Sequence, residues 1–462
     1  MSEQEIPRVL FTKEMKKTHT LLLPNMLPTH FKIIREIFVN FGYKAELLQN
    51  ESSNVIAEGL KYVHNDMCYP AQLVIGQMID ALKSGKYDKK KVALVITQTG
   101  GGCRASNYIY LLRKALVKAE MAYIPVVSLN FGLEDNPGFK FTTKMLLQSV
   151  AAIEYGDIIA LLGNQTRPYE VNKGETNALI ESWTHKLAKK FANNSGYFGT
   201  ALAGNIREIA KDFAAIPTKD IKKIKVGVVG EIYIKFAPLG NNHLQDFLEE
   251  EGCEVMIPGL LGYFLYSMEN ARFDKEYYGG FKRKAQFPIR NAITSFVIST
   301  ETMMYRTVAE VTDKFVLPEG FRHEKTLSKD IIDHGVKMGE GWLLSAEIME
   351  LNELGYPNIV CAQPFGCLPN HIVAKGAIRS ITAKEPDINI VPIDYDPSTA
   401  KVNQENRIKL MLSVAREKMP DAVKPEKKNK SVNDESHSSP HTITPELKTN
   451  IAASTKVNSW EL

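Results

Sequence analysis

The chain has 462 residues, 44% of them apolar, and is therefore long enough for two or three domains of ordinary size. Its 57 lysines and arginines nearly balance its 53 aspartates and glutamates, and a net charge of +4 is far from the basic surface that nucleic-acid binding requires. The N-terminal segment lacks the pattern of a secretion signal, and no apolar run approaches the roughly 20 residues of a membrane span. We therefore expect a cytoplasmic protein that binds neither nucleic acid nor a membrane.

Short β-branched runs alternate with loops and with segments of helical periodicity along most of the chain. This alternation predicts an α/β fold in which parallel sheets are flanked by helices. We expect two doubly wound lobes, residues 1–220 and 221–420. The predicted strands are His19–Leu23, Val92–Thr97, Ile124–Leu129 and Asp157–Leu162 in the first lobe, and Lys225–Val229, Asn358–Cys361 and Asn389–Ile393 in the second.

Helices are predicted between the strands and in two longer stretches. The stretch Glu175–Asp220 is expected to be helical, and Phe264–Lys337 is expected to be a mostly helical insertion in the second lobe. From Asp421 the composition turns to Lys, Ser, Thr, Asn and Pro without apolar periodicity, which predicts a disordered tail over 421–462. The helices predicted between strands are His30–Phe41, Ala71–Leu82, Asn107–Ala119, Asn242–Glu250, Leu343–Leu354, Asn370–Ile381 and Glu405–Glu417.

Three of the five cysteines share one context, a loop that leads into the start of a helix. Cys68 comes two residues before Pro70, and proline is favoured in the first turn of a helix. Cys103 and Cys367 each lie between a predicted strand and a predicted helix, where α/β proteins place their ligands. In a reducing cytosol an odd number of cysteines indicates thiols or metal ligands and not a disulfide framework.

The start of a helix favours anionic sulfur, because unpaired backbone N–H groups and the positive end of the helix dipole stabilise a thiolate. Glycines beside Cys103 and Cys367 allow the backbone to approach a bulky inorganic group. A single free cysteine is more often an inert core residue. Three in matching contexts favour one shared metal site that consists of Cys68, Cys103 and Cys367.

The remaining candidate ligands fit ordinary structural roles better. Cys361 lies in an apolar strand and Cys253 follows a helix end, so both are expected in the core, with Cys361 as a possible fourth ligand. His64 and His371 are expected to be loop or surface residues. The chain has no C-x-x-C pair, so structural zinc is a weaker interpretation than an iron–sulfur cluster.

Two glycine-rich stretches do not indicate nucleotide binding. Gly100–Gly102 and Gly227–Gly230 lack the Lys-Ser/Thr pair of a P-loop and the full spacing of a dinucleotide-binding fingerprint. The stretch Gly230–Asn242 is expected to be a loop that feeds a helix. It either lines a cleft or forms a tight turn.

Three segments carry a resemblance to a known family: Asn65–Pro70, Gln98–Tyr108 and Phe365–His371. Here the chain resembles the 2-hydroxyacyl-CoA dehydratase superfamily, and most of all the cluster-bearing C-terminal region of the acyl-CoA dehydratase activase-like proteins. The resemblance covers most of residues 6–415. Further matching stretches are Leu22–Pro28, Arg167–Glu170, Gly339–Trp342, Asp394–Asp396 and Val402–Asn406.

The resemblance implies a 4Fe-4S cluster bound by Cys68, Cys103 and Cys367, with a fourth iron that is open or carries a non-cysteine ligand. It implies reversible loss of water from a 2-hydroxyacyl-CoA by a ketyl-radical route in an anaerobic, oxygen-sensitive lyase, or a related acyl-CoA reductase component. A separate ATP-dependent activase would supply the electron, since this sequence lacks the acidic-Gly-Gly phosphate-binding series of the activase ATPase domain. Known dehydratases pair two cluster subunits, so a homo- or heterodimer is expected. The resemblance assigns no catalytic side chain.

Two other functions are compatible with the sequence. An electron-transfer or regulatory iron–sulfur protein would not turn over an acyl-CoA, and a cluster closed by a fourth protein ligand such as Cys361 would favour it. A metal-free binding protein of doubly wound fold would require that all three loop cysteines are accidental.

Overall fold

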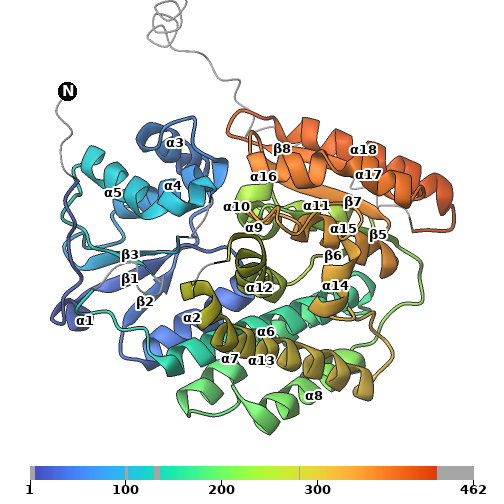
Figure 1. The fold of residues 1–462 in the computed structure, drawn as a ribbon, viewed down its shortest axis with the longest axis horizontal. Coiled ribbons are helices and arrows are strands. Elements are labelled where there is room, and N and C mark those ends of the chain that lie inside the picture. Colours follow the sequence, from blue (N-terminus) through green and yellow to red (C-terminus); the bar gives the residue numbers. More distant parts are fainter. Residues whose placement is uncertain (1–5, 99–101, 129–135, 280, 424–462) are drawn as a thin grey trace, which may run out of the picture. The chain divides into compact units, whose positions relative to one another are not determined.

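The computed structural model describes residues 6–98, 102–128, 136–279 and 281–423, with the backbone alone for 281–287. Residues up to Lys424 form one compact unit, and the rest of the chain belongs to a second. Within the first unit, two four-stranded parallel sheets are each flanked by helices (Figure 1). The predicted α/β class with two doubly wound lobes is thus confirmed. The tail predicted from Asp421 lies, from residue 424 on, outside the described residues.

The first sheet has the strand order β2-β1-β3-β4 and is parallel throughout. The chain starts at β1, adds β2 on one side and then crosses to β3 and β4 on the other, which is the doubly wound arrangement. All five residues of β3 are buried, as expected for a strand that helices cover on both faces. The strands are β1 (Thr20–Leu23), β2 (Lys44–Leu47), β3 (Val92–Ile96) and β4 (Val126–Ser128).

The second sheet repeats this order as β6-β5-β7-β8, again with every pairing parallel. Its central strand β7 is buried at all seven residues. Strands β3 and β7 therefore occupy the same place in their two sheets, which matters for the cysteines that follow them. The strands are β5 (Ile224–Gly230), β6 (Cys253–Met256), β7 (Asn358–Pro364) and β8 (Asn389–Tyr395).

Alternate residues of the first sheet enter two different cores, because neighbouring side chains of a strand point to opposite faces. Leu21 and Leu23 belong to the core that contains Phe38 of α2, whereas Leu22 belongs to the core that contains Leu73 of α4. The helices of this lobe are α1 (Met15–Thr18), α2 (Pro28–Asn40), α3 (Ser53–Tyr62), α4 (Tyr69–Lys83), η1 (Arg104–Asn107), α5 (Tyr108–Lys118), α6 (Thr143–Thr166), η2 (Arg167–Tyr169), α7 (Glu175–Ala192) and α8 (Gly199–Ala215).

The core around α4 continues into the second lobe, where Val228 and Leu239 join it. Helix α4 packs against α3 and α5 of its own lobe and against α10 of the other. This explains why almost every residue of α4 is buried. The helices of the second lobe are α9 (Ile232–Phe236), α10 (Pro238–Asn241), α11 (Leu244–Glu250), α12 (Leu260–Tyr278), α13 (Phe281–Val311), α14 (Phe321–Leu327), α15 (Leu343–Glu353), α16 (Leu368–Asn370), η3 (His371–Lys375), α17 (Ile378–Lys384) and α18 (Lys401–Lys418).

The predicted strand Asp157–Leu162 is wrong, because these residues lie inside helix α6. Helix α6 is covered on most sides, so its apolar residues show no helical periodicity, and a short apolar run does not distinguish a strand from a buried helix. By length and composition the segment Thr143–Tyr169 could cross a membrane, although 61% of its most apolar window is buried inside the protein. The expectation that no apolar run reaches such a length is corrected accordingly.

One predicted helix is divided in the structure, and two strands were not predicted. The predicted helix Asn370–Ile381 is divided into α16, the π-helical turn η3 and α17. At the end of the turn the N–H of Gly376 donates to the carbonyl of His371, five residues earlier, at 2.8 Å. Strands β2 and β6 were not predicted, while the helical stretches Glu175–Asp220 and Phe264–Lys337 are confirmed as α7 and α8 and as α12 to α14.

Candidate metal centre

Cys103 and Cys367 occupy equivalent positions in the two lobes. Cys103 follows β3 and Cys367 follows β7, and each is the residue directly before the first helical turn of its loop. Cys68 is likewise the residue before a helix, here the interlobe helix α4. The prediction that each cysteine lies in a loop directly before a helix is thus confirmed. All three cysteines are partly buried. In Figure 1, α4 lies beside α10 of the second lobe, and the two helices are in contact.

Cys68 is held at the start of α4 with an extended backbone, and Pro70 lies in the first turn of the helix. Its Sγ atom lies 3.2 Å from the phenol oxygen of Tyr108, the first residue of α5. Burial raises the pKa of the Cys68 thiol, and the hydrogen bond with Tyr108 opposes this shift. Without a metal ion the thiol therefore keeps its proton near neutral pH.

The loop of Cys103 meets the second lobe directly. Gly100 and Gly101 of the predicted glycine run lie outside the described residues, but Gly102 is described. A Cβ atom on Gly102 would lie 2.3 Å from Sδ of Met338, so the glycine lets this side chain from the other lobe approach the loop. The carbonyl of Cys103 accepts a hydrogen bond from the Ser106 hydroxyl at 2.7 Å, which fixes the turn into η1.

Cys367 is held by the side chain of Asn370. The Nδ2 atom of Asn370 lies 3.5 Å from Sγ of Cys367 and also donates to Oε2 of Glu340 at 2.9 Å. Burial, followed by the charge of Glu340, raises the pKa of the Cys367 thiol to about 12. A cluster that binds here must displace the proton of this thiol, so binding is expected to strengthen as pH rises.

Two glutamates lie among the cysteine loops. Glu231 directly follows β5, and its Oε2 atom accepts the N–H of Ile234 at 2.8 Å. Oε1 of Glu340 accepts the N–H of Ile232 at 3.1 Å, so the two carboxyl groups hold the same turn. Burial, followed by the charge of Glu340, raises the pKa of Glu231 to about 8. At neutral pH this pair therefore retains a proton.

Gly230 makes the position of Glu231 possible. Its φ of +145° is unfavourable for other residues, and a Cβ atom would lie 1.8 Å from the carbonyl oxygen of Ala362 on β7. The N–H of Glu231 in turn donates to that carbonyl at 3.1 Å. Glu231 is thus fixed between β5 and β7, where the winding of the second sheet reverses and where such folds bind ligands.

Charge interactions connect Cys68 with both Cys367 and Cys103, the first of these through Glu231. After burial and hydrogen bonding, the charge of Glu231 contributes to the raised pKa of both Cys68 and Cys367, and Cys103 contributes to that of Cys68. Within the described part of the chain, no three His, Cys, Asp or Glu side chains form a group that could hold a single metal ion. That all three sulfurs are within reach of one cluster stays a prediction.

The donor set fits a cluster better than a single ion. Each cysteine of a cluster binds a different iron, so the three sulfurs need not converge on one point. The three thiols begin three helical turns whose backbone N–H groups favour negative charge. The proton retained by Glu231 and Glu340 limits the negative charge that would oppose an anionic cluster. Cys68, Cys103 and Cys367 would hold the cluster, and Tyr108 and Asn370 would donate to its sulfur ligands.

The other candidate ligands have the expected structural roles. Cys253 and Cys361 are fully buried in β6 and β7, as predicted for core residues. The side chain of His64 is 69% exposed, and His371 lies 3.5 Å from a carboxylate oxygen of Asp394. Cys361 packs in an apolar core that also contains Val229 and Ile359, which disfavours it as a fourth ligand.

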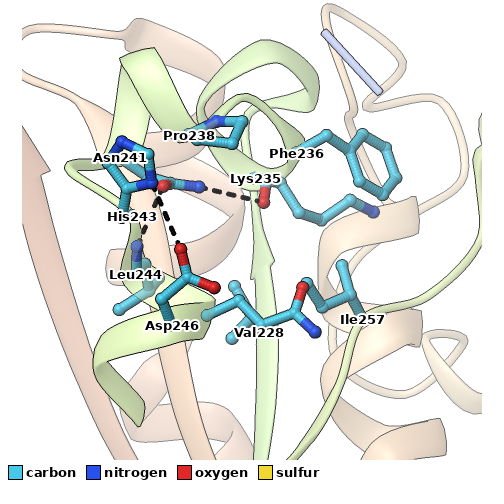
Figure 2. A pocket seen from close by; sticks show the side chains of 10 residues that line it. Val228, Lys235, Phe236, Pro238, Asn241, His243, Leu244, Asp246 and Ile257 are labelled. Carbon is cyan, nitrogen blue, oxygen red and sulfur yellow. Dashed lines mark hydrogen bonds and ion pairs between the residues drawn. The ribbon is translucent and has the colours of Figure 1, made fainter. Parts of the chain in front are cut away.

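A small cavity of about 80 Å³ lies beside α9, α10 and α11 (Figure 2). Its polar groups already have protein partners: Asn241 is bonded to the N–H of Leu244 and to the carbonyl of Ile234, and His243 is bonded to Asp246. In Figure 2 the Lys235 side chain extends away from Asn241 and His243. The cavity is small and its hydrogen bonds are satisfied, so we assign it no ligand. It is lined by Val228, Lys235, Phe236, Pro238, Asn241, His243, Leu244, Gln245, Asp246 and Ile257.

The sequence indicated the cysteines but only part of their surroundings. The stretch Gly230–Asn242 was predicted to be a loop, but most of it forms the short helices α9 and α10, and Glu231 caps the first of them. Glu340 lies in one of the stretches that carry the family resemblance, without a predicted role. Tyr108 and Asn370 were quoted within such stretches but not as contacts of sulfur. Comparison of the chain with protein-family profiles and with curated proteins gives no match.

Proposed function

We propose that this chain is an iron–sulfur protein of the 2-hydroxyacyl-CoA dehydratase type. Cys68, Cys103 and Cys367 would bind a 4Fe-4S cluster, and the protein would act in the cytoplasm on an acyl-CoA thioester after a separate ATP-dependent reductase has supplied an electron. The observation that carries the proposal is the equivalent placement of Cys103 and Cys367 after β3 and β7, with Glu231 in electrostatic contact with Cys68 and Cys367.

A cluster with three cysteine ligands would supply an iron that can bind a substrate oxygen as a Lewis acid. The residues of the chain would supply the proton chemistry. Glu231 and Glu340 keep a proton near neutral pH because they are buried and close to each other. A protonated carboxyl group at this position can donate a proton to a hydroxyl group that leaves as water.

The electron-transfer alternative requires a site closed by the protein. The burial of Cys361 in the core around Val229 and Ile359 favours the open site instead. In this alternative a side chain other than cysteine would have to bind the fourth iron. A resonance signal that does not change when substrate is added would support the electron-transfer function.

The test of cluster binding is metal analysis of protein purified without oxygen. We expect four irons and four acid-labile sulfides for each chain, and a paramagnetic resonance signal after reduction. Replacement of Cys68, Cys103 or Cys367 by Ala should each remove the cluster. Cys253→Ala is the matched control, because it also removes a thiol but from a buried strand. Wild-type protein without iron, or three variants with full iron content, would contradict the proposal.

The test of substrate class uses the reduced holoprotein. Addition of a 2-hydroxyacyl-CoA should change the resonance signal of the cluster, while free CoA should leave it unchanged. Turnover should require a small amount of an ATP-hydrolysing reductase. If no acyl-CoA changes the signal although the cluster is present, the electron-transfer function is the better explanation.

A further inference from the structure

A line of glutamates follows helix α15 from the interior of the second lobe to its surface. Glu347, Glu350 and Glu353 recur at every third residue of the helix, and residues at this spacing are neighbours on a helix surface. Their exposure rises along the line, from 1% for Glu347 and 7% for Glu350 to 47% for the side chain of Glu353. Glu340 precedes the helix and is also buried. The charge of Glu340 acts on Glu347, so the line runs from solvent toward the carboxyl group that shares Asn370 with Cys367.

Neighbouring helices add carboxyl groups to this line and very little positive charge. Glu324 of α14 and Glu301 of α13 are each 5% exposed. Lys235 is the one buried lysine or arginine in the part of the chain that the structure describes. Its Nζ atom lies 2.7 Å from Oε1 of Glu347. One ammonium group thus faces several buried carboxyl groups.

Such a group of carboxyls cannot be fully ionised, because an unpaired buried charge is very unfavourable. One carboxylate oxygen in this group is free to take up a proton. Oε2 of Glu347 is buried and has no hydrogen-bond partner among the described residues, whereas Oε1 is held by Lys235. Burial, followed by the charge of Glu301, raises the pKa of Glu350 to about 8, and burial raises that of Glu324 as well. Burial, followed by the charge of Glu301, also raises the pKa of Tyr305 on α13, so this tyrosine is a further titratable group beside these carboxyl groups.

The outer end of the line carries a group suited to exchange protons with water. Nε2 of His323 lies 2.7 Å from Oε2 of Glu353, and its other ring nitrogen lies 3.5 Å from a carboxylate oxygen of Glu319. The side chains of Glu353 and Glu319 are both exposed to solvent. An imidazole ring can both accept and donate a proton, so His323 can pass a proton from solvent to Glu353.

We propose that Glu353, Glu350, Glu347 and Glu340, with Glu324 beside them, form a proton path from the solvent at His323 to the candidate metal centre. Each transfer moves one proton from a carboxyl group to its inner neighbour, and a proton from solvent replaces the first one. The path is a property of the folded second lobe. Its use rests on the proposed function.

In that use the bond between carbon and the hydroxyl oxygen of the substrate breaks and the oxygen keeps both electrons of the bond, while the adjacent carbon loses a proton to solvent. The electron that activated the substrate returns to the protein at the end of each turnover, so the net change is the loss of one water molecule. The proton held by Glu340 and Glu231 completes the water molecule that leaves. The path then returns a proton to this pair from solvent. The single electron that activates the substrate comes from the separate reductase, so electrons and protons reach the site by different routes.

The first test asks whether the carboxyl groups of the path carry protons, and it needs no cluster. Infrared spectra of the full-length protein at neutral pH should contain the absorption of protonated carboxyl groups, and Glu350→Gln should weaken it. Glu254→Gln is the matched control, because Glu254 is equally buried but lies on β6, where Tyr169 and Tyr356 donate to it. A spectrum without this absorption, or an equal loss in both variants, would overturn the path.

The second test follows proton uptake when a 2-hydroxyacyl-CoA is added to the reduced holoprotein, with a pH-indicator dye in weakly buffered solution. Glu350→Gln should slow uptake on the order of 100-fold, the range typical of a lost proton-transfer group. Iron content and the rate of electron transfer should stay as in wild type, and Glu254→Gln should behave as wild type. An unchanged uptake rate in Glu350→Gln would overturn the path. If the protein binds no cluster, the proposed function fails, and the infrared result still decides on the path.

Discussion

The Nε2 atom of His30 lies 2.8 Å from Oδ1 of Asp157, and the same carboxylate accepts the backbone N–H groups of Leu260 and Leu261 at 2.9 and 2.8 Å. One buried side chain thus joins α2, α6 and the N-terminus of α12. A Cβ atom on Gly156 would lie 2.3 Å from the His30 ring, so the glycine allows the two helices to approach. The negative charge also complements the positive end of α12.

Replacement of Asp157 by Ala should therefore destabilise the protein strongly. The change leaves His30 and two N–H groups without their acceptor, and each buried donor that loses its partner costs about 1–3 kcal/mol. Asp157→Asn keeps one oxygen acceptor and should cost less. The free energy of unfolding in urea measures both. The exposed Asp387→Ala is the control, expected within about 0.5 kcal/mol of wild type, and an equally small effect at Asp157 would contradict the assigned role.

Replacement of Lys235 by Met should destabilise the protein in a pH-dependent way. Burial raises the pKa of Glu347 and Lys235 lowers it, so loss of the lysine raises it further. The loss should therefore be smaller at about pH 5 than at about pH 8, and at most the roughly 3–5 kcal/mol of an unpaired buried carboxylate. Urea unfolding at the two pH values measures the difference. An effect independent of pH would mean that Glu347 is not charged in the wild-type protein.

The wild-type protein should lose stability as pH rises from about 5 to about 8. Burial raises the pKa of Glu154, Glu231 and Glu350 to about 8, and that of Glu301 to about 7. Between the unfolded and folded pKa values the folded state holds protons that the unfolded state has released. Each such proton contributes a loss of about 1.4 kcal/mol per pH unit. The contribution of these glutamates to the free energy of unfolding is fully present at a pH below their pKa in the unfolded chain.

Unfolding free energies measured across this pH range test the prediction, and the slope should be smaller in Glu350→Gln, where one of the groups no longer titrates. Stability that rises across this range would contradict the assignment of protonated glutamates to the interior.

Gly230→Ala should prevent stable folding or reduce the stability by several kcal/mol. The strained φ alone costs about 1–3 kcal/mol, and the new Cβ atom would displace the carbonyl of Ala362 in β7. Gly355→Ala is the matched control, because Gly355 also has a positive φ of 83° but no atom within 4 Å of the Cβ position, and should cost about 1–2 kcal/mol. Thermal unfolding compares them, and similar losses would show that the β5–β7 contact can relax.

Strong local patterns predicted most of the fold. Strands β3 and β7 follow clear loop signals, so the start of each was predicted correctly; the end of β3 was one residue too late, and the end of β7, where Gln363 and Pro364 interrupt the apolar run, was three residues too early. Strand β2 was missed because it has only four residues and contains Lys44 and Glu46. Strand β6 was missed for a similar reason, since Glu254 lies within its four residues. At the edge of a sheet, contacts from other parts of the chain decide such short segments.

The candidate site could be predicted where a residue type carries its own chemistry. Cys68, Cys103 and Cys367 could be singled out as candidate ligands from their loops alone. The roles of Glu340 and Glu347 depend on burial, and a sequence does not distinguish a buried glutamate from one on a solvated helix face. The apolar residues around Glu347 and Glu350 in α15 were the available signal, because a helix so apolar has little exposed surface for them.

Helix α6 has a further consequence during synthesis, before the lobes have formed. The nascent segment Thr143–Tyr169 is as apolar and long as a membrane helix, so the cell's insertion machinery could accept it. Asp157 lies near its middle, and an aspartate at the centre of an inserting helix is unfavourable by about 2.5–3.5 kcal/mol. The carboxylate that later joins three helices is thus also expected to keep the emerging chain out of the bilayer.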